Sequence, residues 1–536
     1  MSTIRPWVFT EGEWRRRGLG DLPDYVPPPP VVALNPELPF ELEPLRDAMA
    51  ASVHKVLPHY FVSFELGGDG GANTVNWYLN RLPGGSTRES DGDWLLRDRP
   101  YDPWEAQRPR TDVDGVSWRI LDRAWQIEQA MAAGCDGFFP DWLNLNDGTG
   151  DNRTGQVRQL LDAVVHLGVQ DRFKIALMID GNTSISQAAN LAGLVAKTVE
   201  FSIHPAVWRL PDGRLLVAVY MPEGAAVSTH QGTPAEVLAH WTAYRDQCAA
   251  AGVQVALWFC HQRGPWYGNA TGQGLGETLD PIAYAHGRWG SRNPVETSNP
   301  NIQNAGAAAY CHATFNKPFL NHVSPQSDRP NNDKYEEARG FEQMIESWRT
   351  TITGGADWAQ VATWNDYTEG AMVDPSISGG WVWLDLCAYY GAAWKIGYWP
   401  EIKRDAIYLA HRIHPISGYT EQITVPDQTR HGSTPEVDIV QALVFLTSTA
   451  GTVVRVTSGG VTTEFTPSTG NATFGGTGVH LLTVPLRTGA VSAEIVRSGE
   501  TVARVDSPHT VTLTPLVQDM HYRVTSSLRQ QLGSPA

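Results

Sequence analysis

Cysteine is scarce in this sequence and follows no metal-binding or disulfide pattern. The 536-residue chain has five cysteines, without a CxxC pair or the Cys/His spacing of a zinc site. We therefore expect neither a disulfide framework nor a metal site. Several cysteines lie in apolar runs, which predicts buried free thiols. The five positions are Cys135, Cys248, Cys260, Cys311 and Cys387.

Long apolar segments are also absent, and basic residues are in the minority. No run of about 18 apolar residues occurs, so no membrane insertion is expected. The N-terminal residues lack the apolar core of a secretory signal. Lys and Arg number 41 against 57 Asp and Glu, which gives a net charge of −16. This balance argues against nucleic acid as a partner, because phosphate contacts need clustered basic side chains.

Aromatic residues, in contrast, are plentiful. The chain has 20 Trp and 17 Tyr, in a composition that is 42% hydrophobic and 18% charged and therefore globular. A single aromatic side chain usually fills a core. The large total nevertheless favours a protein that binds sugars, since aromatic rings stack on sugar faces.

The middle of the chain, residues 45–425, alternates between strand-like and helix-like runs. This α/β alternation predicts a (β/α)8 TIM barrel. An open doubly wound sheet is the alternative, but no Gly-rich phosphate loop follows the first strand. A helix is predicted over 335–351. The eight predicted strands are 55–64, 135–139, 173–178, 215–220, 253–258, 282–286, 319–324 and 358–364.

Polar side chains recur where these strands end. In a TIM barrel all carboxyl-terminal strand ends meet at one face, and catalytic groups lie there. For any single residue a structural role is the simpler explanation. The prediction of a functional site therefore rests on the recurrence of polar residues at strand after strand. We expect a substrate-binding role for His59, Tyr60, Asp141, Asp180, Glu223 and His261, and we note Ser324 at the seventh strand.

The eighth strand breaks into a turn that carries two carboxylates, Asp366 and Glu369. Glycoside cleavage needs a proton donor and usually a second carboxylate, which activates water or attacks the sugar. Positions i and i+3 face the same side of a helical turn, so both acids are predicted to point into the barrel mouth. A solvated helix face is the structural alternative. The neighbours expected to contact substrate are Trp364, Asn365 and Tyr367.

Residues 426–536 have a different composition, rich in Thr, Val, Ser and Gly. Short alternating runs at intervals of about 10 residues predict an antiparallel β-sandwich. Its faces are poor in Trp, which favours support of the barrel over carbohydrate binding. The predicted strands are 442–446, 452–456, 479–484, 491–496 and 509–516.

The block from Ala356 to Glu369, with its Trp-Asn-Asp-Tyr-x-Glu core, resembles the signature of glycoside hydrolase family 71, the α-1,3-glucanases or mutanases. The resemblance extends over about residues 45–525 through blocks that occur in the same order. These are His59-Tyr60, residues 130–138, Phe173-Lys174 with Asp180, residues 204–213, residues 317–325 and residues 408–415.

This resemblance implies hydrolysis of α-glucosidic bonds without a metal or organic cofactor. It also implies that Asp366 and Glu369 are the catalytic pair, and we assign Glu369 as general acid and Asp366 as base. The chain departs from the family pattern at residues 368–374, which begin Thr-Glu-Gly where the family often has Gly-Glu-Ser, and at Asp141, where an Asn is usual. The variant block also resembles that of endo-α-mannosidases. A carbohydrate-binding adhesin with little or no turnover is the second functional hypothesis.

Residues 1–44 are predicted to form an N-terminal arm. An Arg-rich segment comes first, and the proline run at 27–30 that follows it is expected to form a semi-rigid spacer. A disordered tail fits the same residues. The arm loosely resembles the starts of actinobacterial phage minor tail proteins. A polysaccharide substrate lies outside a cell, so we expect an extracellular or virion-associated protein whose arm docks on a larger assembly such as a phage tail.

Overall fold

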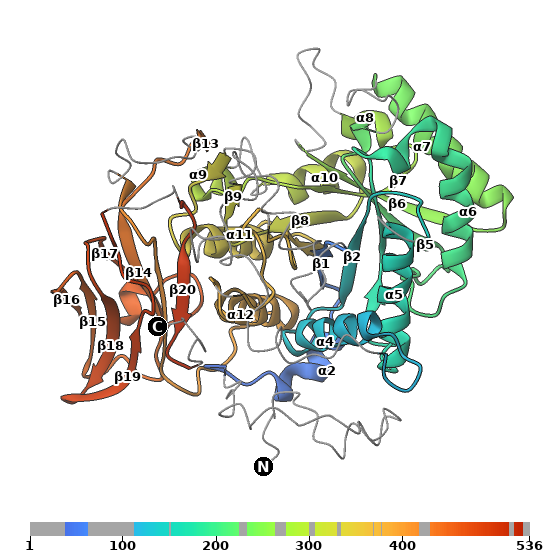
Figure 1. The fold of residues 1–536 in the computed structure, drawn as a ribbon. Coiled ribbons are helices and arrows are strands. Elements are labelled where there is room, and N and C mark those ends of the chain that lie inside the picture. The colour runs from blue at the N-terminus through green and yellow to red at the C-terminus, as the bar shows by residue number, and fades with distance from the viewer. Residues whose placement is uncertain are drawn as a thin grey trace, which may run out of the picture.

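The computed structural model describes residues 38–62, 112–148, 152–224, 233–262, 275–299, 306–329, 334–367, 369–376, 378–416, 429–513 and 519–528. The predicted N-terminal arm lies almost wholly outside these residues, so its predicted docking stays a prediction. The described part contains a barrel and a second, all-β unit (Figure 1).

Eight parallel strands of the described chain close into a barrel, which confirms the predicted TIM barrel. Closure is direct, because β1 pairs with β11 on one side and with β2 on the other. A short strand, β3 (Lys174–Ile175), extends the pairing of β2. In their order around the barrel the strands are β1 (Lys55–Tyr60), β11 (Trp358–Val361), β8 (Phe319–Val323), β7 (Ala283–Arg288), β6 (Val255–His261), β5 (Leu215–Tyr220), β4 (Leu177–Asp180) and β2 (Gly137–Trp142).

Helices cover the outside of this barrel (Figure 1). α7 begins with a capping box, in which Thr233 and Glu236 bond each other's backbone amides, and Pro234 occupies its first turn. The longer helices are α4 (Trp118–Ala132), α5 (Arg153–His166), α6 (Leu191–Ser202), α7 (Pro234–Ala250), α10 (Ala307–Phe315), α11 (Glu342–Thr353) and α12 (Val382–Ile396). The shorter ones are α2 (Arg46–Ala51), α8 (Leu275–Leu279) and α9 (Pro294–Ser298).

The helix predicted over 335–351 is wrong in its first part. Its opening residues belong to β10 (Lys334–Glu336), which pairs with β9 (Ser327–Arg329) and β13 (Thr429–His431) in a small sheet. Arg339 and Gly340 then have positive φ angles of 50° and 62°, which interrupt a right-handed helix. The helix therefore begins only with α11.

The barrel strands alternate between the barrel interior and the layer under the helices. Leu57, Phe139 and Met178 belong to the interior cluster, whereas the residue before each of them on its strand belongs to the main core under the helices. At the carboxyl ends the same alternation turns a defined set of polar side chains inward. This inward set is His59, Asp141, Asp180, Tyr220, His322 and Gln360.

The second unit consists of two four-stranded antiparallel sheets, and it confirms the predicted β-sandwich. One sheet contains β17 (Val479–Pro485), β14 (Ile439–Phe445), β12 (Ala406–His411) and β20 (Arg523–Ser526). The other contains β16 (Val461–Phe465), β15 (Thr452–Ser458), β18 (Val491–Arg497) and β19 (Glu500–Asp506).

Two details of this unit differ from the sequence prediction. β12 lies within the range assigned to the barrel but pairs with β14 and β20 of the sandwich. The strand predicted over 509–516 does not form in its described residues, where Val511 makes only an isolated bridge to Gly489.

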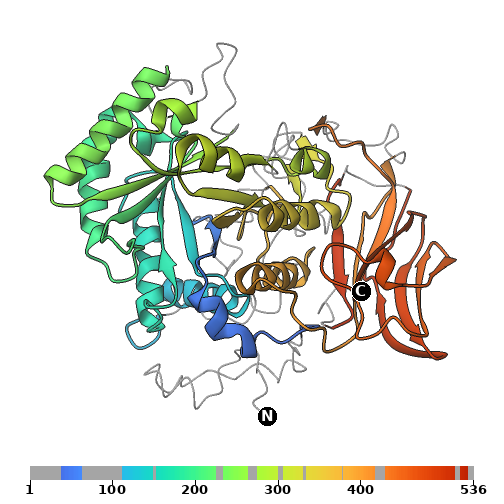
Figure 2. The same cartoon turned by 180° about the vertical axis from the view of Figure 1, so that it is seen from behind.

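The barrel and the β-sandwich share one hydrophobic core. Tyr408 and Phe445, on the barrel-facing side of the first sheet, belong to the same cluster as the barrel helices. The ring centroids of Tyr389 on α12 and Phe445 are 4.9 Å apart, and the Tyr408 hydroxyl bonds the Asp385 carboxylate at 3.1 Å. α11 and α12 lie between the barrel strands and these sheets in both views (Figures 1 and 2). The two units are therefore packed together as one body.

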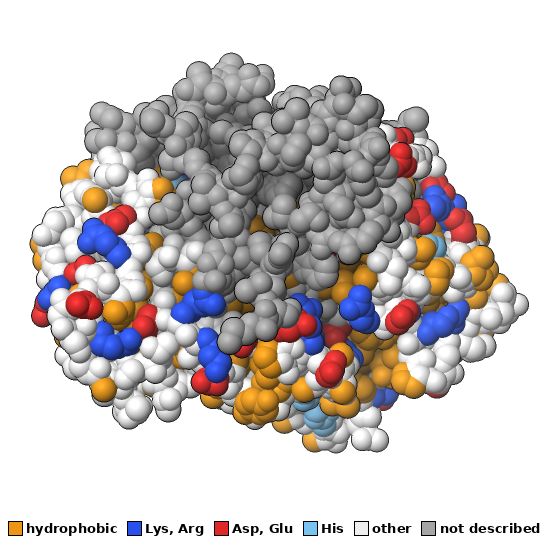
Figure 3. All heavy atoms as spheres, turned by 90° about the horizontal axis from the view of Figure 1, so that it is seen from below, with side chains coloured by type: hydrophobic (Ala, Val, Ile, Leu, Met, Phe, Trp, Pro, Cys, Tyr) orange, Lys and Arg blue, Asp and Glu red, His pale blue; other side chains and the backbone are white. Residues whose placement is uncertain are grey.

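All five cysteines are buried free thiols, as predicted. Among the residues that the structure describes, no helix combines the length and apolar character needed to cross a membrane. On the face seen in Figure 3, acidic and basic side chains of the described residues are interspersed and not segregated by sign.

Candidate active site

The turn after β11 holds the two predicted catalytic acids close together. Its base is closed by backbone bonds from Thr363 to Ala371 at 2.8 Å and from Val373 to Thr363 at 3.0 Å. The Thr363 hydroxyl accepts the Asp366 amide at 2.8 Å, and the Asp366 carboxylate accepts the Glu369 amide at 3.1 Å. The turn thus fixes the separation of Asp366 and Glu369 through local hydrogen bonds.

Two arginines bind the Glu369 carboxylate. Arg292, from the loop after β7, contacts Oε2 of Glu369, and Nη2 of Arg329 on β9 lies 2.9 Å from the same atom. Burial favours the neutral form of Glu369, but Arg329 and Arg292 outweigh it and hold its pKa below the ordinary value. Glu369 is therefore ionised in the free site, which does not fit our assignment of this residue as proton donor.

Asp141 and Asp180 have the opposite character. Burial raises the pKa of Asp141 well above its ordinary value, and the nearby acids Asp180, Asp366 and Glu369 raise it further. Burial also raises the pKa of Asp180 to about 7, although its carboxylate accepts the Asn182 amide at 2.7 Å. The site thus combines an ionised glutamate with two carboxyl groups that hold protons at moderately acidic pH.

His59 connects the end of β1 to these acids. Its Nε2 lies 3.6 Å from Oδ1 of Asp141, and its Nδ1 accepts a hydrogen bond from Nε2 of Gln360 at 3.3 Å. Burial, with a smaller contribution from Arg292, lowers the pKa of His59 to about 3. His59 is therefore a neutral imidazole whose Nε2–H points to Asp141.

An aromatic group lies beside these polar side chains. The Trp289 ring centroid is 4.9 Å from that of His59 and 4.6 Å from that of Tyr220. The guanidinium carbon of Arg292 is 5.3 Å from the centroid of Trp289. Such a surface suits the apolar faces of a sugar ring.

Two of the predicted residues face away from the barrel interior. Tyr60 and Trp364 both pack on Phe138, with ring centroids 4.9 Å and 5.1 Å from it, and the Tyr60 hydroxyl bonds Gln126 of α4. Both side chains are fully buried in the main core. They form the wall that supports the site and do not line its mouth.

Asn365 and Tyr367 anchor the catalytic turn. The Asn365 side chain bonds both the amide and the carbonyl of Phe61, at 2.8 Å and 3.0 Å, and so ties the turn to the end of β1. The Tyr367 hydroxyl donates to Oδ2 of Asp374 at 2.6 Å, and Gln126 donates to the same atom at 3.2 Å. Burial raises the pKa of Asp374 to about 7.

His261 points away from the barrel interior, and Glu223 lies beyond the end of β5. His261 follows Leu257 and Phe259 in the alternation of β6, so its side chain is in the layer under the helices. There its Nε2 lies 3.1 Å from Nδ1 of His286. Glu223 is half-buried in the short 3-10 helix after β5, Pro222–Gly224.

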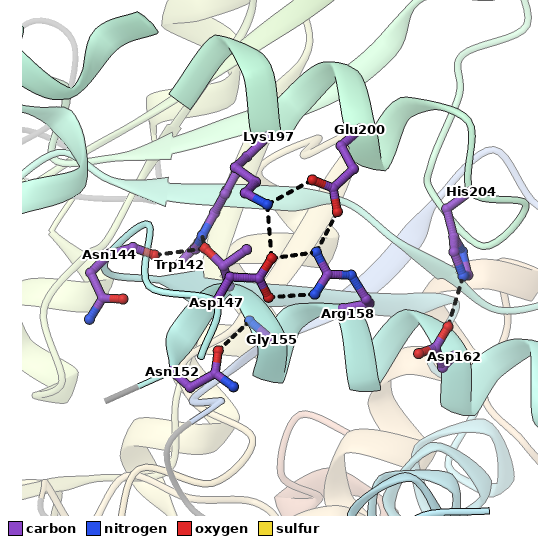
Figure 4. Close-up of polar contacts among 11 residues, drawn as sticks. Trp142, Asn144, Asp147, Asn152, Gly155, Arg158, Asp162, Lys197, Glu200 and His204 are labelled. Carbon is purple, nitrogen blue, oxygen red and sulfur yellow. Dashed lines mark hydrogen bonds and ion pairs between the residues drawn. The ribbon is translucent and has the colours of Figure 1, made fainter. Parts of the chain in front are cut away.

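The loop that follows Asp141 is fixed from outside the barrel (Figure 4). Trp142 donates its indole N–H to Thr154 at 3.0 Å, and the Thr154 hydroxyl bonds the Asn144 carbonyl at 3.0 Å. Further along, the Asp147 carboxylate pairs with Arg158 of α5 and with Lys197 of α6, the latter at 2.8 Å. These contacts hold one side of the site mouth in place.

Five side chains of this site are not among the residues predicted from the sequence. Tyr220 and His322 point inward at strand ends. The period-two alternation of their strands predicts this direction, and it would favour them as site residues over Glu223 and Ser324. No sequence signal indicates the other three, which come from loops and from β9. They are Trp289, Arg292 and Arg329.

A closed parallel barrel whose strand ends hold buried carboxylates beside aromatic rings is the arrangement expected of a glycoside hydrolase. Residues 116–531 match Glycosyl hydrolase family 71, and the chain belongs to this family. The match confirms the resemblance carried by residues 356–369.

One relative is the glucan endo-1,3-alpha-glucosidase agn1 of Schizosaccharomyces pombe. It is 25% identical over 405 residues, which cover 72% of this chain and 86% of the relative. Among solved structures, the GH99 endo-alpha-mannosidase of Bacteroides thetaiotaomicron has a TM-score of 0.43 at 14% identity, covering 64% of this chain and 98% of that chain. The GH5_18 protein of Streptomyces cattleya has a TM-score of 0.35 at 12% identity, covering 52% and 76%.

Proposed function

We propose that this glycoside hydrolase cleaves α-glucosidic linkages of an α-1,3-glucan-like polysaccharide outside the cell, with Asp366 and Glu369 as its catalytic carboxylates. The observation that carries the proposal is the pair itself, two acids on one turn at a barrel strand end, with Glu369 between two arginines. The substrate class is supported by the name of the 25% identical relative, an endo-1,3-alpha-glucosidase.

The charge of Glu369 suggests how the two acids divide the reaction. An ionised carboxylate can take a proton from the attacking water or stabilise the positive charge that develops on the sugar. This leaves proton donation within the pair to Asp366, which reverses the assignment made from the sequence. The two arginines hold Glu369 in its charged form, although burial favours the neutral form.

The inward residues around the pair would hold the sugar. The neutral His59 can donate a hydrogen bond from Nε2, and the protonated carboxyl groups of Asp141 and Asp180 can donate to sugar hydroxyls as well as accept from them. Trp289 and Tyr220 offer apolar surface for the C–H face of a ring.

The test is a panel of α-1,3-glucan, α-1,4-glucan, α-mannan and actinobacterial wall glycans, with product analysis. We expect reducing ends to appear with an α-glucan, and Asp366→Asn and Glu369→Gln each to lower the rate by about 10²-fold or more. Circular dichroism checks that both variants are folded. Full activity in either variant would remove the proposed site.

Two other outcomes of the panel identify the alternative functions. Cleavage of mannan alone would show an endo-α-mannosidase-like specificity. The sequence block around Glu369 also resembles that of endo-α-mannosidases. Depletion of a glycan from solution without product would identify an adhesin. Attachment of the N-terminal arm to a phage tail is a separate hypothesis. Absence of immunogold label from phage particles would exclude it.

A further inference from the structure

The residue after Glu369 packs against a side chain of the β-sandwich unit. Gly370 has a φ of +57°, and a methyl group in place of its hydrogen would lie 2.7 Å from Nδ1 of His521 and 3.3 Å from the Asp328 carbonyl oxygen. The imidazole therefore meets the backbone of the catalytic turn directly. His521 lies in the segment that leads into β20.

Hydrogen bonds define the orientation of this ring. The Gln326 amide group is fixed because its oxygen accepts the Tyr522 amide at 2.9 Å while its nitrogen donates to the Tyr522 carbonyl at 3.2 Å. The same nitrogen lies 3.0 Å from Nε2 of His521, which must therefore accept. The Ser378 hydroxyl lies 2.9 Å from Nε2 as well. In the neutral ring the proton is then on Nδ1, the atom that faces Gly370.

The backbone that carries the ring is also held tightly. The Asp519 carboxylate accepts the His521 amide at 3.0 Å and the Arg523 guanidinium at 2.8 Å. Arg412 donates from Nε to the Met520 carbonyl at 3.0 Å. His521 is fully buried, and these hydrogen bonds hold both its ring and its backbone beside Gly370.

Gly370 in turn controls where Glu369 lies. The Glu369 carbonyl accepts the Asp328 amide at 2.8 Å, which joins the catalytic turn to β9. The next residue of β9 is Arg329, whose guanidinium binds the Glu369 side chain at 2.9 Å. A shift of Gly370 toward the space of His521 would thus change the distance between Glu369 and its arginine partner.

We propose that His521 is a positioning residue for the catalytic turn, and that the β-sandwich thereby completes the active site instead of only supporting the barrel. The inference rests on the proposed function in so far as Glu369 acts in catalysis. The packing of His521 on the turn can be tested without that assumption.

The structure offers a matched control at the same interface. Gln441 of β14 also packs on a barrel glycine with positive φ, Gly340, and its side-chain oxygen accepts the Phe341 amide at 2.8 Å. This contact lies at the start of α11 and touches neither acid. A general loosening of the interface would affect His521 and Gln441 variants alike, whereas a positioning role is specific to His521.

The experiment measures amide hydrogen exchange in the 363–376 segment, together with kcat and KM, for His521→Ala, His521→Gln and Gln441→Ala in the full chain. His521→Gln keeps an amide near Gln326 but leaves the space beside Gly370 empty. It replaces His521→Ala in the experiment if the alanine variant does not fold. We expect both His521 variants to exchange about tenfold faster in this segment and to lose about tenfold or more in kcat with little change in KM. Gln441→Ala should match the parent protein in the exchange rate of this segment and in kcat.

Unchanged exchange in a folded His521 variant, or equal effects in Gln441→Ala, would overturn the proposal. Faster exchange with unchanged kcat would overturn the positioning role while leaving the packing contact. Failure of the proposed function has a different signature, namely full activity of Glu369→Gln. If no glycan of the panel is cleaved, the exchange measurement alone decides whether His521 holds the turn.

Discussion

Nη2 of Arg329 lies 2.9 Å from Oε2 of Glu369, so a short strand outside the barrel supplies a positive charge to the turn after β11. Arg292 reaches the same oxygen from the loop after β7. The Glu369 side chain is half-buried, and without these arginines burial would disfavour its charge. The charge state of the site therefore depends on three segments that are far apart in the sequence.

Replacing Arg329 with methionine should make Glu369 easier to protonate. Burial, the largest influence on its pKa, is then opposed mainly by Arg292, so the pKa rises. The acid limb of the pH profile of kcat/KM reports the ionised form of the free enzyme, and we expect it to move to higher pH. Activity should fall most at low pH and recover partly as the pH rises.

The control for this variant is Arg349→Met, which removes an arginine that pairs with Glu346 on α11, remote from the site. Its pH profile should match that of the parent protein. If the acid limb of Arg329→Met lies at the same pH as that of the parent protein, then Glu369 does not control this limb.

Asp374 should make the protein less stable as the pH rises toward neutrality. Its pKa is raised to about 7 by burial, above the value of about 3.9 expected in the unfolded chain. Its stabilising contribution is therefore complete below about pH 4 and is lost as the pH rises through about 7. The loss is up to about 1.4 kcal/mol for each pH unit in this window.

Asp374→Asn should remove this part of the pH dependence. The asparagine oxygen can accept the same two hydrogen bonds from Tyr367 and Gln126, and it carries no charge at any pH. Urea unfolding at pH 5 and pH 8 should show a smaller difference for the variant than for the parent. Asp506→Asn, at an exposed position, is the control, and equal slopes for Asp374→Asn and the parent would contradict the prediction.

The fold could be predicted from the sequence because its signals are local. Alternating runs identify eight strands, and the carboxyl-end rule of barrels places their ends at one face. The spacing over 335–351 is helical, but Arg339 and Gly340 have positive φ angles and Gly340 packs against Gln441 of the β-sandwich, which local spacing does not reveal.

The site could be predicted only in part, for a physical reason. Asp366 and Glu369 are close in the sequence, and the turn brings them together by local bonds. His261 does end a strand, but the period-two alternation of β6 turns its side chain outward. Arg292 and His521 reach the catalytic turn only through tertiary packing, and no spacing in the sequence encodes that.

Glu337→Gln should destabilise the protein strongly. The carboxylate of Glu337 lies 2.6 Å from Nη2 of Arg412 and accepts the Tyr522 hydroxyl at 3.0 Å, and all three side chains are buried. Removing one charge leaves Arg412 buried without its counter-ion, which costs about 3–5 kcal/mol. The free energy of unfolding in urea measures the loss.

The exposed ion pair of Arg504 and Asp506, with N and O 2.6 Å apart, provides the comparison for this prediction. Asp506→Asn should change the free energy of unfolding by about 0–1 kcal/mol, because water screens both charges. Equal effects of Glu337→Gln and Asp506→Asn would show that the buried pair contributes no more than the exposed one.

Asp141→Asn should leave the enzyme nearly as active as the parent, whereas Asp141→Ala should not. Burial and three neighbouring acids keep Asp141 protonated, so asparagine matches both its charge and its size and keeps a polar atom in the place of Oδ1, 3.6 Å from Nε2 of His59. We expect kcat/KM within about threefold for the asparagine variant and a loss of about tenfold or more for alanine, which removes the polar group that faces His59 and the substrate. The pH profile of Asp141→Asn should coincide with that of the parent, since no charge is removed. An inactive Asp141→Asn that is folded would instead mean that Asp141 gives up its proton during the reaction.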